Sequence, residues 1–90
     1  MQITFDESKR LKTLHERGLD FARADEIFDG PEFTDQDFRF DYPEPRFQTY
    51  GYLDDRMVML AWAPTDSGVR VISMRKCNDR EQKRFAKRLG

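Results

Sequence analysis

The chain has 90 residues, of which 38% are hydrophobic, 13% aromatic and 37% charged, and its formal net charge is −1. This composition predicts a single folded domain over residues 1–90 with one core, and it excludes a disordered chain. We expect a cytoplasmic protein rather than a membrane one, because no apolar run approaches the roughly 18 residues of a spanning helix and the first six residues do not form a signal peptide.

The beginning of the chain predicts a short strand followed by a helix. Gln2–Phe5 alternates polar and apolar residues, as a half-buried strand does. Asp6 is placed to cap a helix that runs to about Arg17, and we expect Leu11 and Leu14 to face inward from it. The glycine that follows predicts the end of this helix.

The next stretch predicts a second helix and then an irregular segment. Phe21, Ala24 and Phe28 recur at helical spacing, and the Asp-Gly-Pro sequence after them predicts the end of the helix. Glu32–Pro45 is acidic, aromatic and bounded by prolines. We expect one weak strand around Phe33 and a loop after it.

The second half of the chain predicts three consecutive strands, Arg46–Leu53, Met57–Ala63 and Val69–Met74. They are separated by Asp54-Asp55 and by residues 64–68, both of which are rich in turn-forming residues. Such short connections predict an antiparallel meander. The middle strand is apolar on both sides, as expected of a central strand.

A final helix is predicted to begin after Asn78. Glu81, three residues later, completes a capping-box pattern, and Phe85 and Leu89 form the packing stripe of the helix. The resulting order, β-α-α-β-β-β-β-α, predicts an α+β fold. We expect its helices to pack on one face of an antiparallel sheet and to leave the other face free to bind a partner.

Charge is divided unevenly along the chain. Residues 1–45 contain six Lys or Arg against twelve Asp or Glu, whereas residues 46–90 contain ten against five. Arg70–Lys76 concentrates cations in an apolar strand directly before the last helix, whose first N–H groups also attract anions. This pattern indicates a polyanionic partner.

Few residues are available for the commoner catalytic mechanisms. The single cysteine, Cys77, excludes an internal disulfide and a cysteine zinc cluster. The single histidine, His15, excludes a two-histidine ribonuclease mechanism and a histidine-based metal site. Ser73 has no evident histidine base, and the sequence contains no glycine-rich phosphate loop. We therefore expect neither a metal nor a cofactor.

The residues that remain for function are cations and tyrosines of the predicted sheet. Guanidinium groups bind phosphate in a bidentate manner and aromatic rings stack on exposed bases, so this set suits single-stranded RNA. RNA cleaves itself when its 2′-hydroxyl attacks the adjacent phosphate, and positioned cations stabilise the charge that develops. The candidates are Arg46, Arg70, Arg75 and Lys76 for catalysis, and Tyr50, Tyr52 and Arg80 for RNA binding.

Two alternatives stay open at this point. A general base would be Glu44 or Glu81, although the helix cap already explains Glu81 and no spacing argument selects Glu44. The protein is either an enzyme that cleaves RNA or a non-catalytic module that binds nucleic acid or an acidic protein with the same basic sheet.

Several stretches together carry a family resemblance. They are Phe5-Asp6-Glu7-Ser8-Lys9, Glu16-Arg17-Gly18-Leu19-Asp20-Phe21, Arg46-Phe47 before Gly51, and Arg70-Val71-Ile72-Ser73-Met74-Arg75-Lys76 followed by Arg80-Glu81. The chain resembles, over nearly its whole length, the BrnT toxins of bacterial type II toxin–antitoxin systems. The last stretch is the most specific part of the resemblance.

The resemblance implies a RelE-like ribonuclease fold and RNA cleavage that arrests growth. It also implies neutralisation by a BrnA antitoxin, whose ribbon-helix-helix dimer would carry two toxins and bind the operator DNA. The cations of the family fall on Arg46, Arg70, Arg75 and Lys76, and its Arg-Glu pair falls on residues 80 and 81. Many members have Lys-His-Gly where this chain has Glu-Arg-Gly at residues 16–18, so no role for that histidine transfers.

Overall fold

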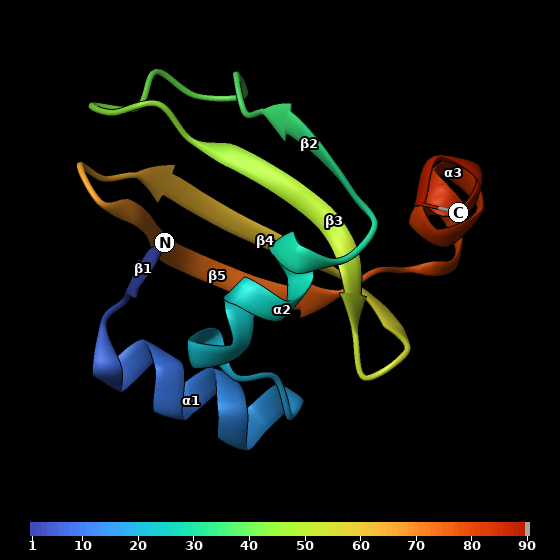
Figure 1. The fold of residues 1–90 in the computed structure, drawn as a ribbon, viewed down its shortest axis with the longest axis horizontal. Coiled ribbons are helices and arrows are strands. Elements are labelled where there is room, and N and C mark those ends of the chain that lie inside the picture. The colour runs from blue at the N-terminus through green and yellow to red at the C-terminus, as the bar shows by residue number, and fades with distance from the viewer. Residues whose placement is uncertain (90) are drawn as a thin grey trace.

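The computed structural model describes residues 1–89, which form an α+β fold of five strands and three α-helices (Figure 1). The elements in chain order are β1 (Gln2–Thr4), α1 (Glu7–Arg17), the 3₁₀ turn η1 (Phe21–Arg23), α2 (Ala24–Asp29), β2 (Glu32–Gln36), β3 (Phe47–Leu53), β4 (Arg56–Pro64), β5 (Gly68–Lys76) and α3 (Asp79–Leu89). This order confirms the predicted pattern and the α+β class. No helix in the described part is long and apolar enough to cross a membrane.

The strands form one mixed sheet in the order β1-β5-β4-β3-β2. β2 to β5 are antiparallel neighbours as predicted, but β1 runs parallel to β5, with Gln2 opposite Gly68. The prediction of a wholly antiparallel sheet is therefore wrong at this edge, because β1 pairs with the last strand and not with a neighbour in sequence. A Cβ at position 68 would lie 2.1 Å from the Gln2 carbonyl oxygen, so the pairing requires glycine there.

The main core lies on one face of the sheet, under η1 and α2. Leu19, Phe21 and Ile27 form one cluster there with Val58 and Leu60 of β4, and each of the five is at most 1% exposed. In Figure 1 α2 lies in front of the sheet and α1 runs below it. Burying side chains of this size stabilises the fold by about 1.5–3 kcal/mol each, so this cluster fixes the sheet that carries the site.

α1 begins and ends where the sequence predicts. The Asp6 side chain accepts the Lys9 N–H at 3.0 Å and caps the first turn. Gly18 ends the helix in the left-handed conformation, with a φ of 68°. Both boundaries follow from single residues whose chemistry acts locally, which is why the sequence pattern is sufficient to place them.

The face that α1 turns toward the protein differs from the predicted one. Leu11 and Leu14 are 54% and 38% exposed, and α1 has no buried residue, so the prediction that these leucines face inward is wrong. Polar contacts attach the helix instead. Arg10 Nε donates at 2.8 Å to the carboxylate of Asp20, which caps η1. Arg17 Nη1 donates at 2.7 Å to the carbonyl of Met74 in β5.

The opposite face of the sheet is partly covered by α3. The rings of Tyr50 in β3 and Phe85 in α3 stack with their centroids 4.0 Å apart, and Phe33 of β2 stacks on Phe85 at 5.5 Å. The other buried members of this second cluster are Met57, Met59, Cys77 and Leu89. The prediction that all helices pack on one face is therefore wrong, because β4 is apolar on both sides and each side must be covered.

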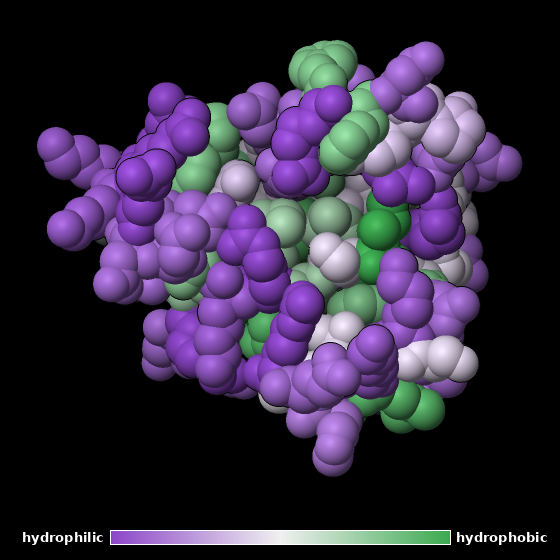
Figure 2. Space-filling model, turned by 180° about the vertical axis from the view of Figure 1, so that it is seen from behind, coloured by the Kyte–Doolittle hydropathy of each residue, from purple (hydrophilic) through white to green (hydrophobic). Residues whose placement is uncertain are grey.

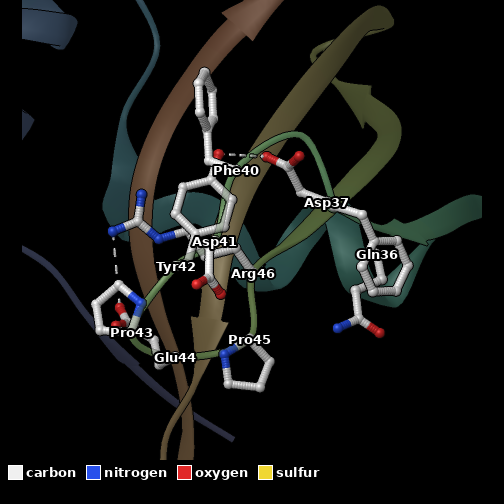
Figure 3. A pocket seen from close by; sticks show the side chains of 10 residues that line it. Gln36, Asp37, Phe40, Asp41, Tyr42, Pro43, Glu44, Pro45 and Arg46 are labelled. Atoms are coloured by element: carbon white, nitrogen blue, oxygen red, sulfur yellow. Dashed lines mark hydrogen bonds and ion pairs between the residues drawn. The ribbon is translucent and has the colours of Figure 1, made fainter.

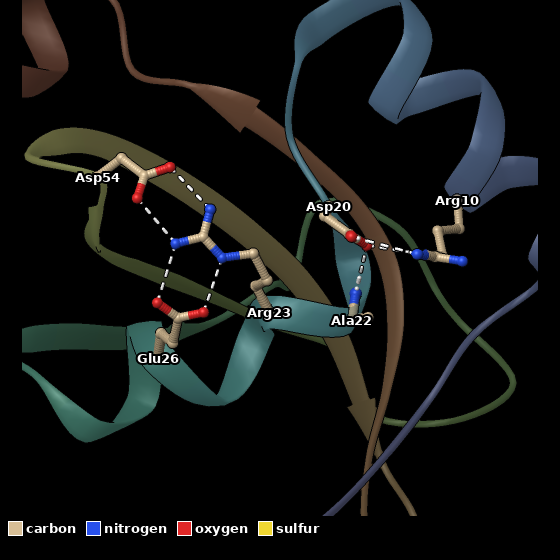
Figure 4. A network of polar contacts seen from close by, with 6 residues as sticks. All are labelled: Arg10, Asp20, Ala22, Arg23, Glu26 and Asp54. Carbon is tan, nitrogen blue, oxygen red and sulfur yellow. Dashed lines mark hydrogen bonds and ion pairs between the residues drawn. The ribbon is translucent and has the colours of Figure 1, made fainter.

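A polar network joins α2 to the turn between β3 and β4 (Figure 4). The Arg23 guanidinium lies between the carboxylates of Glu26 and Asp54, with contacts of 2.7–2.9 Å. Asp54 and Asp55 both have positive φ angles, 52° and 63°, as a two-residue hairpin turn requires. Exposed ion pairs of this kind add little stability, but the bidentate geometry fixes where the turn lies relative to α2.

Candidate active site

Arg70 and Arg75 lie on the same face of β5, although residues five apart in a regular strand face opposite sides. The register between β4 and β5 shifts in the middle of the pairing, where Ile72 has no partner and β5 therefore contains one more residue than β4. Arg70 is opposite Ala63 and Arg75 is opposite Met59, and these partners share one face of β4. Since Met59 packs in the α3 cluster, both arginines project on the α3 side of the sheet.

α3 covers one end of this face and leaves the rest open. Gln48 of β3 lies opposite Ala61 of β4 in the middle of the face, and both side chains are only partly buried. Figure 2, which views the molecule from behind, shows apolar and neutral atoms in the middle of this side with hydrophilic side chains around them. We call the uncovered part of the sheet, between α3 and the segment before β3, the open face.

Glu44 joins two of the predicted arginines at one end of the open face. Its Oε1 atom contacts Nη2 of Arg70 directly and lies 3.8 Å from Nη2 of Arg46. The Arg46 guanidinium also lies over the ring of Tyr42, with Cζ 4.3 Å from the ring centroid. The Nε atom of Arg46 is buried and has no hydrogen-bond partner within residues 1–89. The structure thus brings Arg46 and Arg70 together, with a carboxylate between them.

Arg75 is held at the other end of the open face by Glu81. Both Glu81 carboxylate oxygens accept from the Arg75 guanidinium at 2.8 Å. Glu81 also accepts the Asn78 N–H at 3.0 Å while Asn78 Oδ1 accepts the Glu81 N–H at 2.8 Å, which confirms the predicted capping box. The Arg75 hydrogen bonds and the Asn78 N–H lower the pKa of Glu81 to about 2.

This arrangement has two consequences for the predicted chemistry. The sequence suggested that a bound phosphate occupies the start of α3. In the structure the protein's own Glu81 carboxylate occupies this position. A carboxylate with a pKa of about 2 is also a very weak base near neutral pH. Of the two glutamates considered as general base, Glu44, which lies between Arg46 and Arg70, is the one that remains.

Lys76 differs from Arg70 and Arg75 in the face of β5 from which it projects. Its register partner, Val58, belongs to the main core, so Lys76 projects from the opposite face of β5. At the strand end it lines a cavity of about 450 Å³ together with Glu16, Arg17 and Arg75. Arg17 is a cation that the sequence analysis did not select, because only the tertiary contact of α1 with β5 brings it here.

The three residues predicted to bind RNA differ in accessibility. Tyr50 is 8% exposed and stacked on Phe85, which leaves no ring face for a base, whereas Tyr52 is 36% exposed. Tyr52 and Lys76 line a cavity of about 360 Å³ beside α3. Arg80, in the first turn of α3, is exposed.

The segment between β2 and β3 forms a further cavity that the sequence analysis did not identify (Figure 3). It has a volume of about 250 Å³ and is lined by residues 36–38 and 40–46. Its wall includes Glu44 and Arg46, so it adjoins the arginine pair of the open face. The acidic and aromatic composition of this segment was the only signal in the sequence.

The structure also locates Cys77 and His15, to which the sequence analysis assigned no catalytic role. Burial raises the pKa of the Cys77 thiol to about 11, which outweighs any lowering by Arg75 beside it. His15 is exposed on α1. Within the part of the chain that the structure describes, no three His, Cys, Asp or Glu side chains are grouped so as to hold a metal ion.

The fold and the open face define a small α+β protein whose sheet carries two arginines on one face, each paired with a glutamate. Comparison with known families then assigns it. The family described as the ribonuclease toxin BrnT of type II toxin–antitoxin systems matches residues 5–81, and the chain belongs to this family. No curated protein matches the chain. Family membership gives a ribonuclease activity and an antitoxin partner, and it favours the enzyme over the non-catalytic module.

Proposed function

We propose that the protein is a metal-independent endoribonuclease that binds single-stranded RNA across the open face. The observation that carries this proposal is the irregularity in β5, which puts Arg70 and Arg75 on one face of the sheet. Five residues of strand span roughly 16 Å, so the two guanidiniums contact different parts of the RNA backbone. The arginines supply the positive charge that a metal ion provides in other nucleases.

Cleavage takes place at the Glu44 end of the open face. The RNA 2′-hydroxyl attacks the adjacent phosphorus, its proton passes to Glu44, and the bond to the 5′-oxygen of the next nucleotide breaks. Arg46 and Arg70 stabilise the additional negative charge on the phosphate oxygens as this bond changes. The products are a 2′,3′-cyclic phosphate and a 5′-hydroxyl, the latter formed when the leaving oxygen takes a proton from solvent.

The remaining predicted residues contact the RNA away from the reacting phosphate. Arg75 binds a neighbouring phosphate, and Lys76, Tyr52 and Arg80 receive the strand where it passes the end of α3. Tyr50 supports this surface from below through its stacking on Phe85. The RelE-like character of the fold belongs to this proposal, since the α+β sheet is compatible with it.

The antitoxin is proposed to be a BrnA-like ribbon-helix-helix protein. One antitoxin dimer carries two toxins and binds the operator DNA, and the complex acts in the cytoplasm. The proposal extends the family's type II toxin–antitoxin character to a partner that covers the arginines of the open face. Charge-pair contacts at the rim of such an interface accelerate association at low salt.

Cleavage of a single-stranded RNA by the purified protein in the presence of EDTA tests the activity. We expect cleavage in EDTA and a loss on the order of 100-fold in Arg70→Ala, by analogy with removal of one oxyanion donor. Lys83→Ala, an exposed residue of α3 outside the open face, is the control. Unchanged cleavage by a folded Arg70→Ala variant would remove Arg70 from the mechanism, and loss of cleavage in EDTA that Mg²⁺ restores would overturn metal independence.

A further inference from the structure

We propose that the cavity of the segment between β2 and β3 binds one base of the RNA, and that it selects guanine. The inference rests on the proposed function and adds the sequence preference of the site. Residues 36–38 and 40–46 line the cavity, whose volume is about 250 Å³. Figure 3 shows Phe40 above the Tyr42 ring and Asp41 and Glu44 below it, with the Asp37 carboxylate accepting from the Tyr42 hydroxyl.

Aromatic rings give the cavity a stacking surface. The Arg46 guanidinium covers one face of the Tyr42 ring, with Cζ 4.3 Å from the centroid, which polarises and orients the ring. The Phe40 ring meets Tyr42 edge-on, with centroids 5.8 Å apart and an angle of 74°. Phe40 and Phe38 are 68% and 77% exposed. Exposed rings grouped in this way are the usual platform for an unstacked RNA base.

The charges of the wall indicate a base and not a phosphate. Asp37, Asp41 and Glu44 line the cavity together with a single cation, Arg46, so a phosphate inside it would be repelled. An uncharged base with N–H donors is attracted by the same carboxylates. The lining therefore complements the part of a nucleotide that the arginines of the open face do not bind.

Asp41 is the carboxylate available to a ligand. Asp37 already accepts from Arg39 and from the Tyr42 hydroxyl, which hold its pKa well below the ordinary value and keep it charged. Glu44 is paired with Arg46 and Arg70. Asp41 lines the same cavity and is exposed.

Guanine matches a free carboxylate better than the other bases do. It presents two adjacent donors, N1–H and the N2 amino group, to the two oxygens of one carboxylate, in the bidentate geometry that favours such pairs. Uracil has a single N3–H between two carbonyl oxygens, which a carboxylate repels. Adenine and cytosine have one amino group beside an unprotonated ring nitrogen, so they pair with one oxygen only.

The position of the cavity couples base recognition to cleavage. Glu44 is part of the cavity wall and also contacts Arg46 and Arg70. A base that stacks on Tyr42 therefore places its own phosphate at the two arginines. Recognition of guanine here fixes which phosphate of the RNA is attacked, so Asp41 and the aromatic platform are specificity residues of the nuclease.

Binding of guanosine 3′-monophosphate and uridine 3′-monophosphate to the protein, followed by NMR chemical shifts, tests the inference. We expect the guanosine nucleotide to bind roughly tenfold or more tightly, the range of a good bidentate base contact, and to shift the resonances of Tyr42 and Phe40. Asp41→Asn should remove the preference for guanosine. Asp66→Asn, an exposed carboxylate in the β4–β5 turn, is the matched control and should retain it.

Equal affinity for both nucleotides, or shifts confined to residues outside the segment, would overturn the inference. Phe40→Ala provides an independent check, since its ring is exposed and its loss does not affect the core; unchanged guanosine affinity in this variant would also count against the platform. These measurements do not depend on cleavage. Guanosine binding at the cavity without RNA cleavage would contradict the proposed nuclease mechanism alone, and cleavage without guanosine preference would contradict the inference alone.

Discussion

The arginines proposed for the site are each paired with a glutamate before any RNA binds. Arg70 contacts Glu44, and Arg75 forms a bidentate pair with Glu81. The pairing orders the guanidiniums, but it also lowers the positive charge of the open face. An RNA phosphate must compete with these carboxylates for the arginines. A phosphate displaces the carboxylate more easily at Arg70, which makes one hydrogen bond to Glu44, than at Arg75, which makes two to Glu81.

Acid should weaken the pair between Arg75 and Glu81 and with it the start of α3. The pKa of Glu81 is lowered from 4.5 to about 2, chiefly by the Arg75 hydrogen bonds. Because the folded-state value is the lower one, the stabilisation is complete above about pH 4.5 and is lost as the pH falls toward 2. We expect Glu81→Gln to lower the free energy of unfolding by about 1–2 kcal/mol at pH 7, after allowance for solvent screening.

Urea unfolding of both proteins between pH 7 and pH 2 measures this effect. The difference between wild type and variant should shrink steadily below pH 4.5, because the wild-type carboxylate then becomes protonated and resembles the glutamine. A difference of constant size down to pH 2 would show that the ionised pair contributes nothing. Comparison of the two proteins removes the contribution of other acidic groups.

Among the helices and strands, the features that local chemistry determines could be predicted from the sequence. Asp6 and the capping box at Asn78 place both long helices, and alternating apolar residues place the strands of the meander. Three features depend on contacts between distant segments and could not be predicted: the partner of β1, the face on which α3 packs, and the extra residue in β5. The candidate arginines were identifiable from their charges, but their common face was not.

The orientation of α1 leads to a prediction about stability. Leu14 is 38% exposed on α1 and Leu19 is fully buried just beyond the helix. We expect Leu14→Ala to change the free energy of unfolding by less than about 0.5 kcal/mol, as surface substitutions do. Leu19→Ala should lower it by about 2–5 kcal/mol, the cost of a cavity in a packed core.

Chemical denaturation of the two variants checks this prediction, with the same side chain removed in each case. A destabilisation of Leu14→Ala as large as that of Leu19→Ala would show that α1 packs on its leucine face. The sequence pattern alone favoured that packing, because leucines three residues apart on a helix usually face the core. The polar attachment of α1 through Arg10 and Arg17 accounts for the difference.

Across the whole molecule, the near-zero net charge hides two regions of opposite sign. The acidic half, residues 1–45, forms the helices on the core face and the outer strand β2, whereas residues 46–90 supply β3 to β5 and α3. Ion pairs connect the two regions, among them Glu44 with Arg70 and Arg23 with Asp54. We expect the resulting field to steer a polyanion toward the basic strands and away from the helices of the core face.

This charge distribution predicts how binding and cleavage respond to substitution and salt. Each phosphate contact to single-stranded RNA contributes about −0.7 to the slope of log affinity against log salt. Lys87→Ala, at an exposed position of α3, should reduce that slope by about 0.7 or leave it unchanged. Arg70→Ala should lower the single-turnover cleavage rate far more than the affinity, because its interaction develops in the transition state.

Filter binding at several salt concentrations and single-turnover cleavage at saturating protein separate the two behaviours. Equal losses of affinity in both variants, with no difference in cleavage rate, would assign Arg70 to binding alone. The same titration with the purified antitoxin shows whether the two partners use one surface, since an antitoxin that covers the open face competes with RNA.

The pairing of β1 with β5 has a consequence for folding during synthesis on the ribosome. A ribosome makes the chain from its N-terminus, and Ile3 cannot meet Val69 until the last strand has emerged. β5 is also the strand that carries Arg70 and Arg75, so a nascent chain that ends before residue 76 lacks part of the open face. Long-range pairing of this kind forms late and slowly. We therefore expect the nascent chain to have no nuclease activity until β5 has left the ribosome, and the antitoxin to bind the toxin after it has folded.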